Sequence, residues 1–334
     1  MTSLVFATQR VDPDHPVLGS AVTMISALSR RVDEVTVLAL SAKPGALPDN
    51  CRVRTFAAPT QALRGARFVA VLAQVLLRRR PNAVLAHMSP VYALLAAPLA
   101  RPLGVRVLLW YTQWRTNPLL ERAVRRVDAV LTVDERSFPF SSPKVQPIGH
   151  GIDVERFACV DPPGRERLRL LALGRYSAVK GYDALIDAMR ELDAELVIHG
   201  STETAEERAH ERDVQRLAAE LPGRVAALGP VSPAEVPALL AGADALLSGT
   251  AGGADKVVFE AAASCVPAFA RAPAFARFLP DELRWSDDLP AKLRAFAALG
   301  VPARSELGRT LRARVEEHHS VERWADRVVE AALR

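Results

Sequence analysis

The chain has 334 residues, a length at which a single hydrophobic core has usually stopped growing, so two domains of about 150 residues are expected. With 49% hydrophobic and 24% charged residues, the composition excludes a disordered chain. The net charge is only +5, but residues 1–150 hold 19 Lys and Arg against 9 Asp and Glu, whereas residues 151–334 are acidic. No zinc-finger, RNA-recognition or helix-turn-helix pattern accompanies the basic half, so we expect no nucleic-acid partner.

The cysteines and the hydrophobic segments bear on cellular location. Cys51, Cys159 and Cys265 are odd in number, lie far apart and match no metal-ligand spacing. This favours reduced thiols in the cytoplasm and no disulfide framework. The N-terminus lacks the basic segment of a signal peptide. Residues 91–110 are the most hydrophobic stretch, but two prolines and two arginines interrupt it, which indicates a helix and then a strand rather than a membrane span.

Short apolar strands alternate with helical segments along the first half of the chain. This alternation is typical of βαβ units and parallel sheets. We expect helices over residues 20–30 and 61–80, and strands over 4–8, 35–40, 53–56, 83–87, 105–110 and 129–133. The first half is therefore predicted to be a doubly wound α/β domain.

The same pattern starts again after residues 149–153 and a proline-containing linker at 161–164. Strands are expected over 168–173, 195–199, 225–228, 245–248 and 266–270. Ser232, Pro233 and Glu235 predict a helix start with a capping box. The amphipathic run 320–333 predicts a last helix. We expect this helix to cross back to the first domain, with Trp324 in contact with it. The expected domains are 1–151 with 320–334, and 152–319.

The first group of residues with chemical meaning is a basic loop between a strand and a helix. Arg175 ends a predicted strand and Lys180 opens the next helix, so a short loop can bring both cations to the carboxyl edge of the sheet. Arginine offers a forked contact and lysine a point charge, which suits a diphosphate. The alternative is a solvated basic pair.

The second group follows the strand ending at Ser248. Gly252 and Gly253 allow the backbone to approach a ligand, and the helix that follows presents its N-terminus to an anion. Lys256 and Glu260 lie four residues apart on a helix of otherwise apolar or small residues. We expect Lys256 to contact phosphates and Glu260 to accept hydrogen bonds from ribose, with an intrahelical ion pair as the alternative.

Taken together, these motifs resemble the second domain of retaining GT-B glycosyltransferases of family 4. They occur in the family's order: Gly174-Arg175 with Lys180-Gly181, then residues 232–244, then Asp255 to Ala261. The sequence Gly-His-Gly-Ile-Asp at 149–153, with Phe157, is similar to the family's hinge motif. The resemblance covers nearly the whole chain and implies two Rossmann-like domains that face each other across a cleft.

The resemblance also implies roles for residues. Arg175 and Lys180 match the donor-site cations, Glu260 matches the ribose-binding glutamate, and Gly229 with Val231 falls near the base. The family's motif has a second glutamate, eight residues before the ribose-binding one, and this position is Gly252 here. The chain resembles a subgroup in which Gly252, Gly253, Asp255 and Lys256 replace that acidic residue. Recognition of the sugar is therefore left open. Gly19 lies where the first domain's backbone approaches the donor phosphates.

Two residues are candidates for the polar group near the reacting carbon. His87 ends a predicted strand, and Gln113 follows the strand 105–110, where many relatives have histidine. A histidine at a strand end is more often a structural hydrogen-bonding residue, but its position on the rim of the cleft favours a catalytic role. Glutamine cannot act as a general base, which leaves that role at residue 113 open.

Other features are interpreted as structural. Asp12-Pro13-Asp14 lies in a turn after the first strand and is not expected to bind metal. The basic amphipathic segment 61–80 has a pattern seen at membrane surfaces, but a helix that packs on the sheet and ends in arginines is favoured. Peripheral membrane contact remains the less favoured alternative.

The sequence therefore predicts a metal-independent, retaining transfer of a hexose-type sugar from a nucleoside diphosphate sugar, with UDP favoured, to an acceptor hydroxyl. The donor is a co-substrate, so no cofactor is expected. The alternatives are a nucleotide-sugar epimerase or phosphorylase on the same scaffold, and a non-catalytic partner subunit, for which Gly252 and Gln113 are the reasons.

Overall fold

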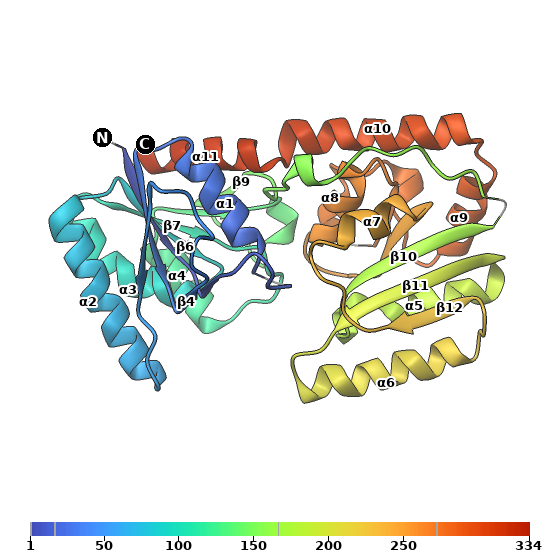
Figure 1. Cartoon of the computed structure of the whole chain (residues 1–334), viewed down its shortest axis with the longest axis horizontal. Coiled ribbons are helices and arrows are strands. Elements are labelled where there is room, and N and C mark those ends of the chain that lie inside the picture. Colours follow the sequence, from blue (N-terminus) through green and yellow to red (C-terminus); the bar gives the residue numbers. More distant parts are fainter. Residues whose placement is uncertain (1, 17, 166, 272) are drawn as a thin grey trace. The chain divides into compact units, whose positions relative to one another are not determined.

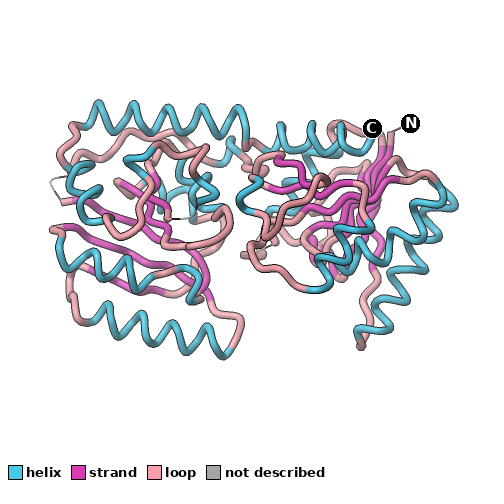
Figure 2. Tube along the Cα trace, turned by 180° about the vertical axis from the view of Figure 1, so that it is seen from behind, coloured by secondary structure: helices cyan, strands magenta, loops and turns pink. Residues whose placement is uncertain are grey.

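The computed structural model describes residues 2–16, 18–165, 167–271 and 273–334. The chain divides into two compact units, residues 1–151 with 320–334 and residues 152–319 (Figure 1). Within each unit, helices flank a parallel β-sheet (Figure 2). This is the α/β architecture that the alternation of strands and helices predicts.

The first unit contains a seven-stranded sheet in the order β5-β3-β1-β6-β7-β8-β9, and all its neighbouring strands are parallel. The two short strands β2 and β4 pair separately. The strands are β1 (Ser3–Ala7), β2 (Arg10–Val11), β3 (Glu34–Ala39), β4 (Ser41–Ala42), β5 (Cys51–Thr55), β6 (Ala83–His87), β7 (Arg106–Trp110), β8 (Ala129–Thr132) and β9 (Val145–Pro147). The six expected strands all form within two residues of the expected bounds. The edge strand β9 was missed because it has only three residues and ends in proline.

The helices of the first unit are α1 (Ser20–Ser29), α2 (Gln61–Arg79), α3 (Pro90–Ala100), α4 (Pro118–Arg126) and α11 (Val321–Leu333). The 3-10 turns are η1 (Arg101–Leu103) and η2 (Glu135–Ser137). The hydrophobic stretch 91–110 is thus α3, η1 and β7. In the described part of the chain, no helix combines the length and apolarity that crossing a bilayer requires.

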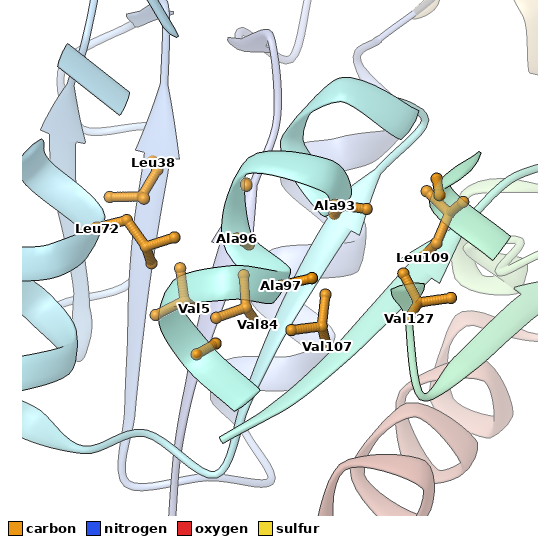
Figure 3. Packing of buried hydrophobic residues seen from close by; sticks show 14 of the residues in the cluster. Val5, Leu38, Leu72, Val84, Ala93, Ala96, Ala97, Val107, Leu109 and Val127 are labelled. Atoms are coloured by element: carbon orange, nitrogen blue, oxygen red, sulfur yellow. The ribbon is translucent and has the colours of Figure 1, made fainter. Parts of the chain in front are cut away.

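The core of the first unit depends on small side chains in α3 (Figure 3). Ala93, Ala96 and Ala97 are buried, and their helix lies over the sheet that carries Val84 and Val107. Alanine lets a helix approach a sheet closely, while the valines fill the remaining space. Every residue of β6 is buried, as expected for a parallel strand covered on both faces.

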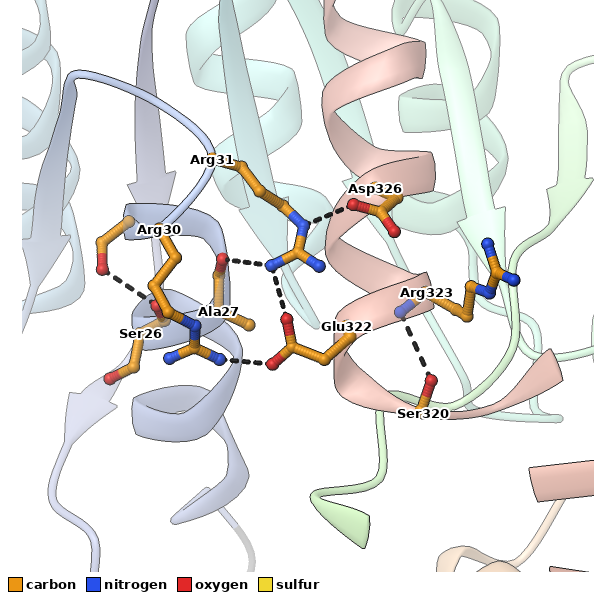
Figure 4. Close-up of polar contacts among 9 residues, drawn as sticks. Ser26, Ala27, Arg30, Arg31, Ser320, Glu322, Arg323 and Asp326 are labelled. Carbon is orange, nitrogen blue, oxygen red and sulfur yellow. Dashed lines mark hydrogen bonds and ion pairs between the residues drawn. The ribbon is translucent and has the colours of Figure 1, made fainter. Parts of the chain in front are cut away.

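The last helix, α11, belongs to the first unit and is held there by both apolar and ionic contacts. Its Trp324 is fully buried and packs edge-on against Trp110 of β7, with ring centroids 5.6 Å apart. The expected contact of Trp324 with the first domain is therefore confirmed. Arg31, just after α1, contacts Glu322 at 2.7 Å and Asp326 at 2.5 Å (Figure 4).

The second unit has a five-stranded parallel sheet in the order β12-β11-β10-β13-β14. Its strands are β10 (Leu168–Arg175), β11 (Ala194–Ser201), β12 (Val225–Leu228), β13 (Ala245–Ser248) and β14 (Ala268–Ala270). Its helices are α5 (Tyr182–Ala188), α6 (Ala205–Ala219), α7 (Val236–Ala241), α8 (Lys256–Ala263), α9 (Leu289–Ala297) and α10 (Val301–His318). The 3-10 turns are η3 (Val154–Arg156), η4 (Ala178–Lys180), η5 (Met189–Glu191), η6 (Pro273–Phe275) and η7 (Asp281–Leu283). All five strands expected from the sequence are present.

The start of α7 differs from the expectation. The helix begins at Val236 with Glu235 in the N-cap position, not at Pro233. Half of the expected capping box is nevertheless present, because the Ser232 backbone N–H donates to a carboxylate oxygen of Glu235 at 2.8 Å. Pro237 lies in the first turn, where a missing N–H costs nothing, so the later start is equally compatible with the sequence.

The expectation of three reduced cysteines is wrong. Cys159 and Cys265 form a disulfide in the second unit, and Cys51 is the free cysteine. The linker that carries Cys159 runs beside the end of α8, where the Val160 N–H donates to the Ser264 carbonyl. Cys159 and Cys265 are 106 residues apart in the sequence but adjacent in the fold, so their sequence separation did not indicate their distance in space. The cysteine argument for a reducing compartment no longer holds.

Removing this disulfide is expected to destabilise the second unit. Closing a loop of 106 residues restricts the unfolded chain, so Cys159→Ser should lower the free energy of unfolding by about 2 to 4 kcal/mol, measured by denaturant unfolding without reductant. Cys51→Ser is the matched control and should change it by less than about 1 kcal/mol. Three reactive thiols per denatured, unreduced parent chain, instead of one, would show that the bond does not form.

Candidate functional site

The candidate site lies in the second unit, where two neighbouring parallel strands end. The strand β10 pairs with β13, and the loops after them, residues 176–181 and 249–255, emerge at the same edge of the sheet. Ligands of open parallel sheets bind at the carboxyl ends of the strands. The two basic motifs of the sequence analysis both belong to this edge.

Two glycines bring these loops together, backbone against backbone. A Cβ atom on Gly181 would lie 2.7 Å from the Gly249 carbonyl oxygen, and one on Gly249 would lie 2.6 Å from the Gly181 carbonyl oxygen. Real Cβ atoms do not approach backbone oxygens so closely. Gly181 also has a φ of +60°, a conformation that favours glycine. The close approach of the loops therefore requires glycine at both positions.

A third glycine makes room for Lys180. A Cβ atom on Gly174 would lie 2.6 Å from Cε and 2.9 Å from Nζ of Lys180, and 3.1 Å from the Tyr182 hydroxyl. The lysine side chain thus folds back over the end of β10. The Tyr182 hydroxyl is buried and has no hydrogen-bond partner among the described residues. At the end of β10, the Lys180 ammonium group therefore lies near the Tyr182 hydroxyl, which is still able to donate a hydrogen bond.

The Lys180 ammonium group contacts Asp255, the N-cap residue of α8. Its Nζ atom lies 2.9 Å from Oδ1 and 2.8 Å from Oδ2. The hydroxyls of Ser248 and Thr250 each donate to Oδ2 at 3.1 Å. The Lys180 and Asp255 side chains are only 19% and 11% exposed. Four groups from two loops thus form one largely buried polar network.

This network keeps Asp255 ionised. Burial raises the pKa of the carboxyl group, but the Lys180 charge and the hydrogen bonds from Lys180, Thr250 and Ser248 act in the opposite direction and prevail. The pKa of Asp255 is consequently lowered from its usual value. At neutral pH the Asp255 side chain is therefore a carboxylate.

Arg175, at the end of β10, contacts a different carboxylate. Its Nη1 atom lies 2.8 Å from Oε1 of Glu207, a buried residue of α6. The second oxygen of Glu207 accepts the backbone N–H groups of Glu203 and Thr204, and Thr204 and Glu207 together form a capping box for α6. Arg175 is 45% exposed, so its guanidinium group is anchored at one side and open at the other.

Lys256 and Glu260 form the intrahelical ion pair that the sequence analysis kept as an alternative. The Lys256 Nζ atom lies 2.5 Å from Oε1 of Glu260, one turn along α8. Lys256 is 37% exposed and Glu260 14%. The three cations expected to converge on a diphosphate thus each contact a separate carboxylate.

The remaining predicted residues of the second unit lie in two loops. Gly252, Gly253 and Asp255 belong to the loop between β13 and α8, and Gly253 has a φ of +77° that favours glycine. Gly229 and Val231 follow β12, two strands away from β10 in the sheet. The Gly229 carbonyl oxygen contacts Nδ1 of His199 at 3.2 Å. These two residues are therefore not part of the Lys180–Asp255 network.

In the first unit, Gly19 and His87 have structural partners. A Cβ atom on Gly19 would lie 2.7 Å from the Pro13 carbonyl oxygen, so packing of its own loop already requires this glycine. His87 is 4% exposed, and its Nδ1 atom lies 3.1 Å from the Thr8 hydroxyl. Burial lowers the pKa of His87 to about 4, so its imidazole is neutral at pH 7. These contacts fit the structural alternative for His87.

Gln113 lies on an exposed segment after β7, where its Oε1 atom accepts a hydrogen bond from the Tyr111 hydroxyl at 3.2 Å. No group of three or more His, Cys, Asp or Glu side chains that could hold a metal ion occurs among the described residues. The charged groups at the candidate site are therefore those of Arg175, Lys180 and Lys256 with their carboxylate partners.

Sequence reasoning missed the groups that support the cations. Ser248 and Thr250 frame Asp255, Glu207 anchors Arg175, and Gly249 allows the two loops to touch. One signal was available: the glycines at 174, 181 and 249 flank both basic motifs, and glycines beside a strand end indicate close backbone approach. The partner of Arg175 is 32 residues away and left no local signal.

Gly174→Ala is expected to disrupt the ion pair of Lys180 without touching either partner. The added methyl group would occupy the space of Lys180 Cε, so the ammonium group would have to move away from Asp255, and the φ of +155° at this position would strain the alanine backbone as well. We expect a loss of about 1 to 3 kcal/mol in the free energy of unfolding, measured by urea denaturation. Gly242→Ala is the control, since its Cβ would meet nothing closer than 3.5 Å. Equal stability of the two variants would contradict this account of Gly174.

Comparison with known proteins places this site in a family context. Residues 167–282 match the family model described as glycosyl transferases group 1. This segment includes Arg175, Lys180, Asp255, Lys256 and Glu260. Curated protein sequences give no match.

The fold of the whole chain is similar to those of solved glycosyltransferases. A glycosyltransferase from Rickettsia africae superposes with a TM-score of 0.77 at 12% identity, covering 99% of this chain and 97% of that one. Sucrose-phosphate synthase from Thermosynechococcus elongatus gives 0.77 at 16% identity, with 99% and 98% covered. HepE from Anabaena, solved with UDP and glucose, gives 0.77 at 14% identity, with 99% of both chains covered. The chain therefore has the GT-B fold of these glycosyltransferases, and residues 167–282 of its second unit match the glycosyl transferases group 1 model.

Proposed function

We propose that this chain is a glycosyltransferase that moves a hexose-type sugar from a nucleoside diphosphate sugar to an acceptor hydroxyl, with retention of configuration and without a metal ion. The second unit binds the donor and the first unit the acceptor. UDP is the favoured nucleotide, because the similar fold of Anabaena HepE has been solved both with UDP and glucose and with UDP-glucose. No further cofactor takes part in this proposal.

One observation carries the proposal: Lys180 is held at the carboxyl edge of the sheet, beside the N-terminus of α8. Lys180 contacts the N-cap residue of that helix, whose first-turn N–H groups carry partial positive charge. A lysine ammonium and a helix N-terminus together form an anion site suited to phosphate. The donor's diphosphate is the anion that the reaction class requires.

The charge balance of the site indicates how a diphosphate binds. Arg175, Lys180 and Lys256 are matched one for one by Glu207, Asp255 and Glu260, so the six groups carry no net charge. A diphosphate must therefore compete with a carboxylate for each of the two lysines, whereas it can use the open side of Arg175. Lys180 is the most buried of the three cations, so its contact with a phosphate would be the least screened by solvent.

In the transfer, the bond between the anomeric carbon and the diphosphate oxygen breaks, and the acceptor oxygen forms the new glycosidic bond. The diphosphate leaves with the electron pair and takes up the proton of the acceptor hydroxyl. Lys180, Arg175 and the N-terminus of α8 stabilise the charge that develops on the leaving group. Glu260 would accept hydrogen bonds from the ribose. We assign no step to His87, because its imidazole is buried against Thr8.

Testing Lys180 requires a pair of variants, because Lys180→Ala alone would leave Asp255 as a buried carboxylate without its cation. We expect the single variant to lose both stability and UDP binding. Adding Asp255→Asn should restore the melting temperature but not the affinity. UDP affinity, measured by calorimetry, should stay about 10- to 100-fold below that of the parent, the value of one charge-assisted contact.

Lys292→Ala is the matched control, since Lys292 belongs to the second unit and contacts Asp288 instead. It should bind UDP like the parent. If the folded double variant also binds UDP like the parent, Lys180 is not a phosphate ligand and the proposed donor site is wrong.

Catalysis is expected to continue in EDTA, because Lys180, Arg175 and the helix N-terminus take the part that a divalent ion has in other transferases. Once an acceptor has been found, the rate of sugar transfer in excess EDTA should stay within about twofold of the rate with added Mg²⁺ or Mn²⁺, against a roughly tenfold or larger loss for an enzyme that needs the ion. A rate that falls to background in EDTA and returns with added metal would contradict the metal-independent mechanism.

A further inference from the structure

The first unit has a pocket at the edge of its sheet where the strands begin, opposite to the carboxyl ends. The cavity measures about 490 Å³ and lies between the segment that precedes β6, the turn that precedes β7 and the end of α11. Arg80, Asn82, Leu103, Arg106, Leu333 and Arg334 are among its lining residues. We call it the Arg80–Arg106 pocket. Nothing in the proposed transfer uses it.

The pocket carries an excess of positive charge. None of its lining side chains is acidic, although three are arginines. Arg334 contacts Glu330, but the Arg80 and Arg106 side chains have neither a carboxylate nor a hydrogen-bond partner among the described residues. The Nε atom of Arg106 is buried and unsatisfied. A buried donor without an acceptor is unfavourable by itself, so a ligand acceptor would stabilise this arrangement.

The neighbouring arginines at this edge behave differently. Arg79 contacts Glu34 at 3.2 Å, and Arg101 contacts Asp128 at 3.3 Å. Neither of these two arginines lines the pocket. Carboxylates are thus present at this edge, and they contact the arginines outside the pocket. Arg80 and Arg106 differ from these two arginines because they lack a carboxylate partner among the described residues.

The backbone at Arg80 adds a second argument. Arg80 ends α2 in the left-handed conformation, with a φ of 45°, and its N–H donates to the Leu76 carbonyl oxygen. Glycine is the usual residue at such a position because side chains strain this conformation. Glycine would end the helix equally well. The arginine side chain is therefore not needed for the helix end and is available for a ligand.

We propose that the Arg80–Arg106 pocket binds a phosphorylated ligand. Guanidinium groups pair with phosphate through parallel N–H···O contacts, and two of them on one anion give affinity and orientation. The cavity is larger than a phosphate ion, and the apolar side chains of Leu103 and Leu333 form part of its wall. The ligand is thus a phosphate monoester or diester on a compact body with an apolar side.

Such a phosphate has two sources, a small phosphorylated molecule or the headgroup of an anionic phospholipid. Leu103 and Leu333 are 44% and 53% exposed, so they could contact either the body of a small ligand or the surface of a bilayer. Both sources share the same contacts to Arg80 and Arg106. The experiment separates them by its choice of probes.

The test uses the full chain with two probes. Glycerol 1-phosphate is titrated by calorimetry at constant ionic strength, and vesicles of phosphatidylcholine with 30 mol% phosphatidylglycerol are assayed by co-sedimentation against pure phosphatidylcholine. Arg80→Gly and Arg106→Gln should each weaken binding of the active probe by about tenfold or more. Arg101→Gln is the matched control, an arginine at the same edge with a carboxylate partner, and should stay within about twofold of the parent.

Arg80→Gly also protects the test against misfolding. Because glycine suits a φ of 45°, this variant should melt at or above the temperature of the parent while it loses binding. Binding of glycerol 1-phosphate alone would identify a small phosphorylated ligand, and binding of phosphatidylglycerol vesicles alone a lipid headgroup. The proposal is overturned if the parent binds neither probe, or if Arg80→Gly and Arg106→Gln bind as tightly as Arg101→Gln.

Discussion

One constraint shapes the site in the second unit: a buried carboxylate, that of Asp255, needs a cation beside it. Asp255 is 11% exposed, and an ionised carboxylate at such a depth requires both a charged partner and hydrogen-bond donors. Lys180 supplies the charge, and Ser248 and Thr250 supply two further donors. Because these groups come from different loops, the loops must touch, which is possible only with glycine at 181 and 249. The glycines and the polar network are therefore parts of one arrangement.

The same need for partners explains where prediction from sequence ended. Hydrophobic periodicity located every strand of the two large sheets except the edge strand β9, because strand burial is a local pattern that a single sequence records. The cations at 175, 180 and 256 were also found locally, as charges at strand ends and on an apolar helix. Of their partners, Glu260 lies one turn away on the same helix as Lys256, and Asp255 was expected at the site but not as the partner of Lys180, whereas Glu207 was not found. Arg175 pairs 32 residues along the chain and Lys180 pairs 75 residues along it, and charge pairing at such separations leaves no periodic signal.

The cysteines show the same limit. Cys159 and Cys265 meet because a linker of irregular structure runs beside the end of α8, and the path of such a linker cannot be derived from its composition. The formation of α11 could be predicted, since its apolar side is periodic and its N-cap Ser320 marks the start. Its salt bridges to Arg30 and Arg31 then depend on α1 lying next to it, which sequence alone did not show. A helix or a strand can be predicted from its local sequence, whereas the elements that pack against it cannot.

The contact between Gly181 and Gly249 has a consequence for how this site can change during evolution. Each glycine is required by the other's backbone, so a substitution at one position cannot be accommodated by a substitution at the other. Only a shift of a whole loop would relieve the clash, and that shift would separate Lys180 from Asp255. New donor preferences should therefore arise from residues outside this contact, such as the open loop position Gly229, around which no atom lies within 4 Å of an added Cβ. The contact between Gly181 and Gly249 must therefore be kept, while the rest of the proposed donor site can change in sequence.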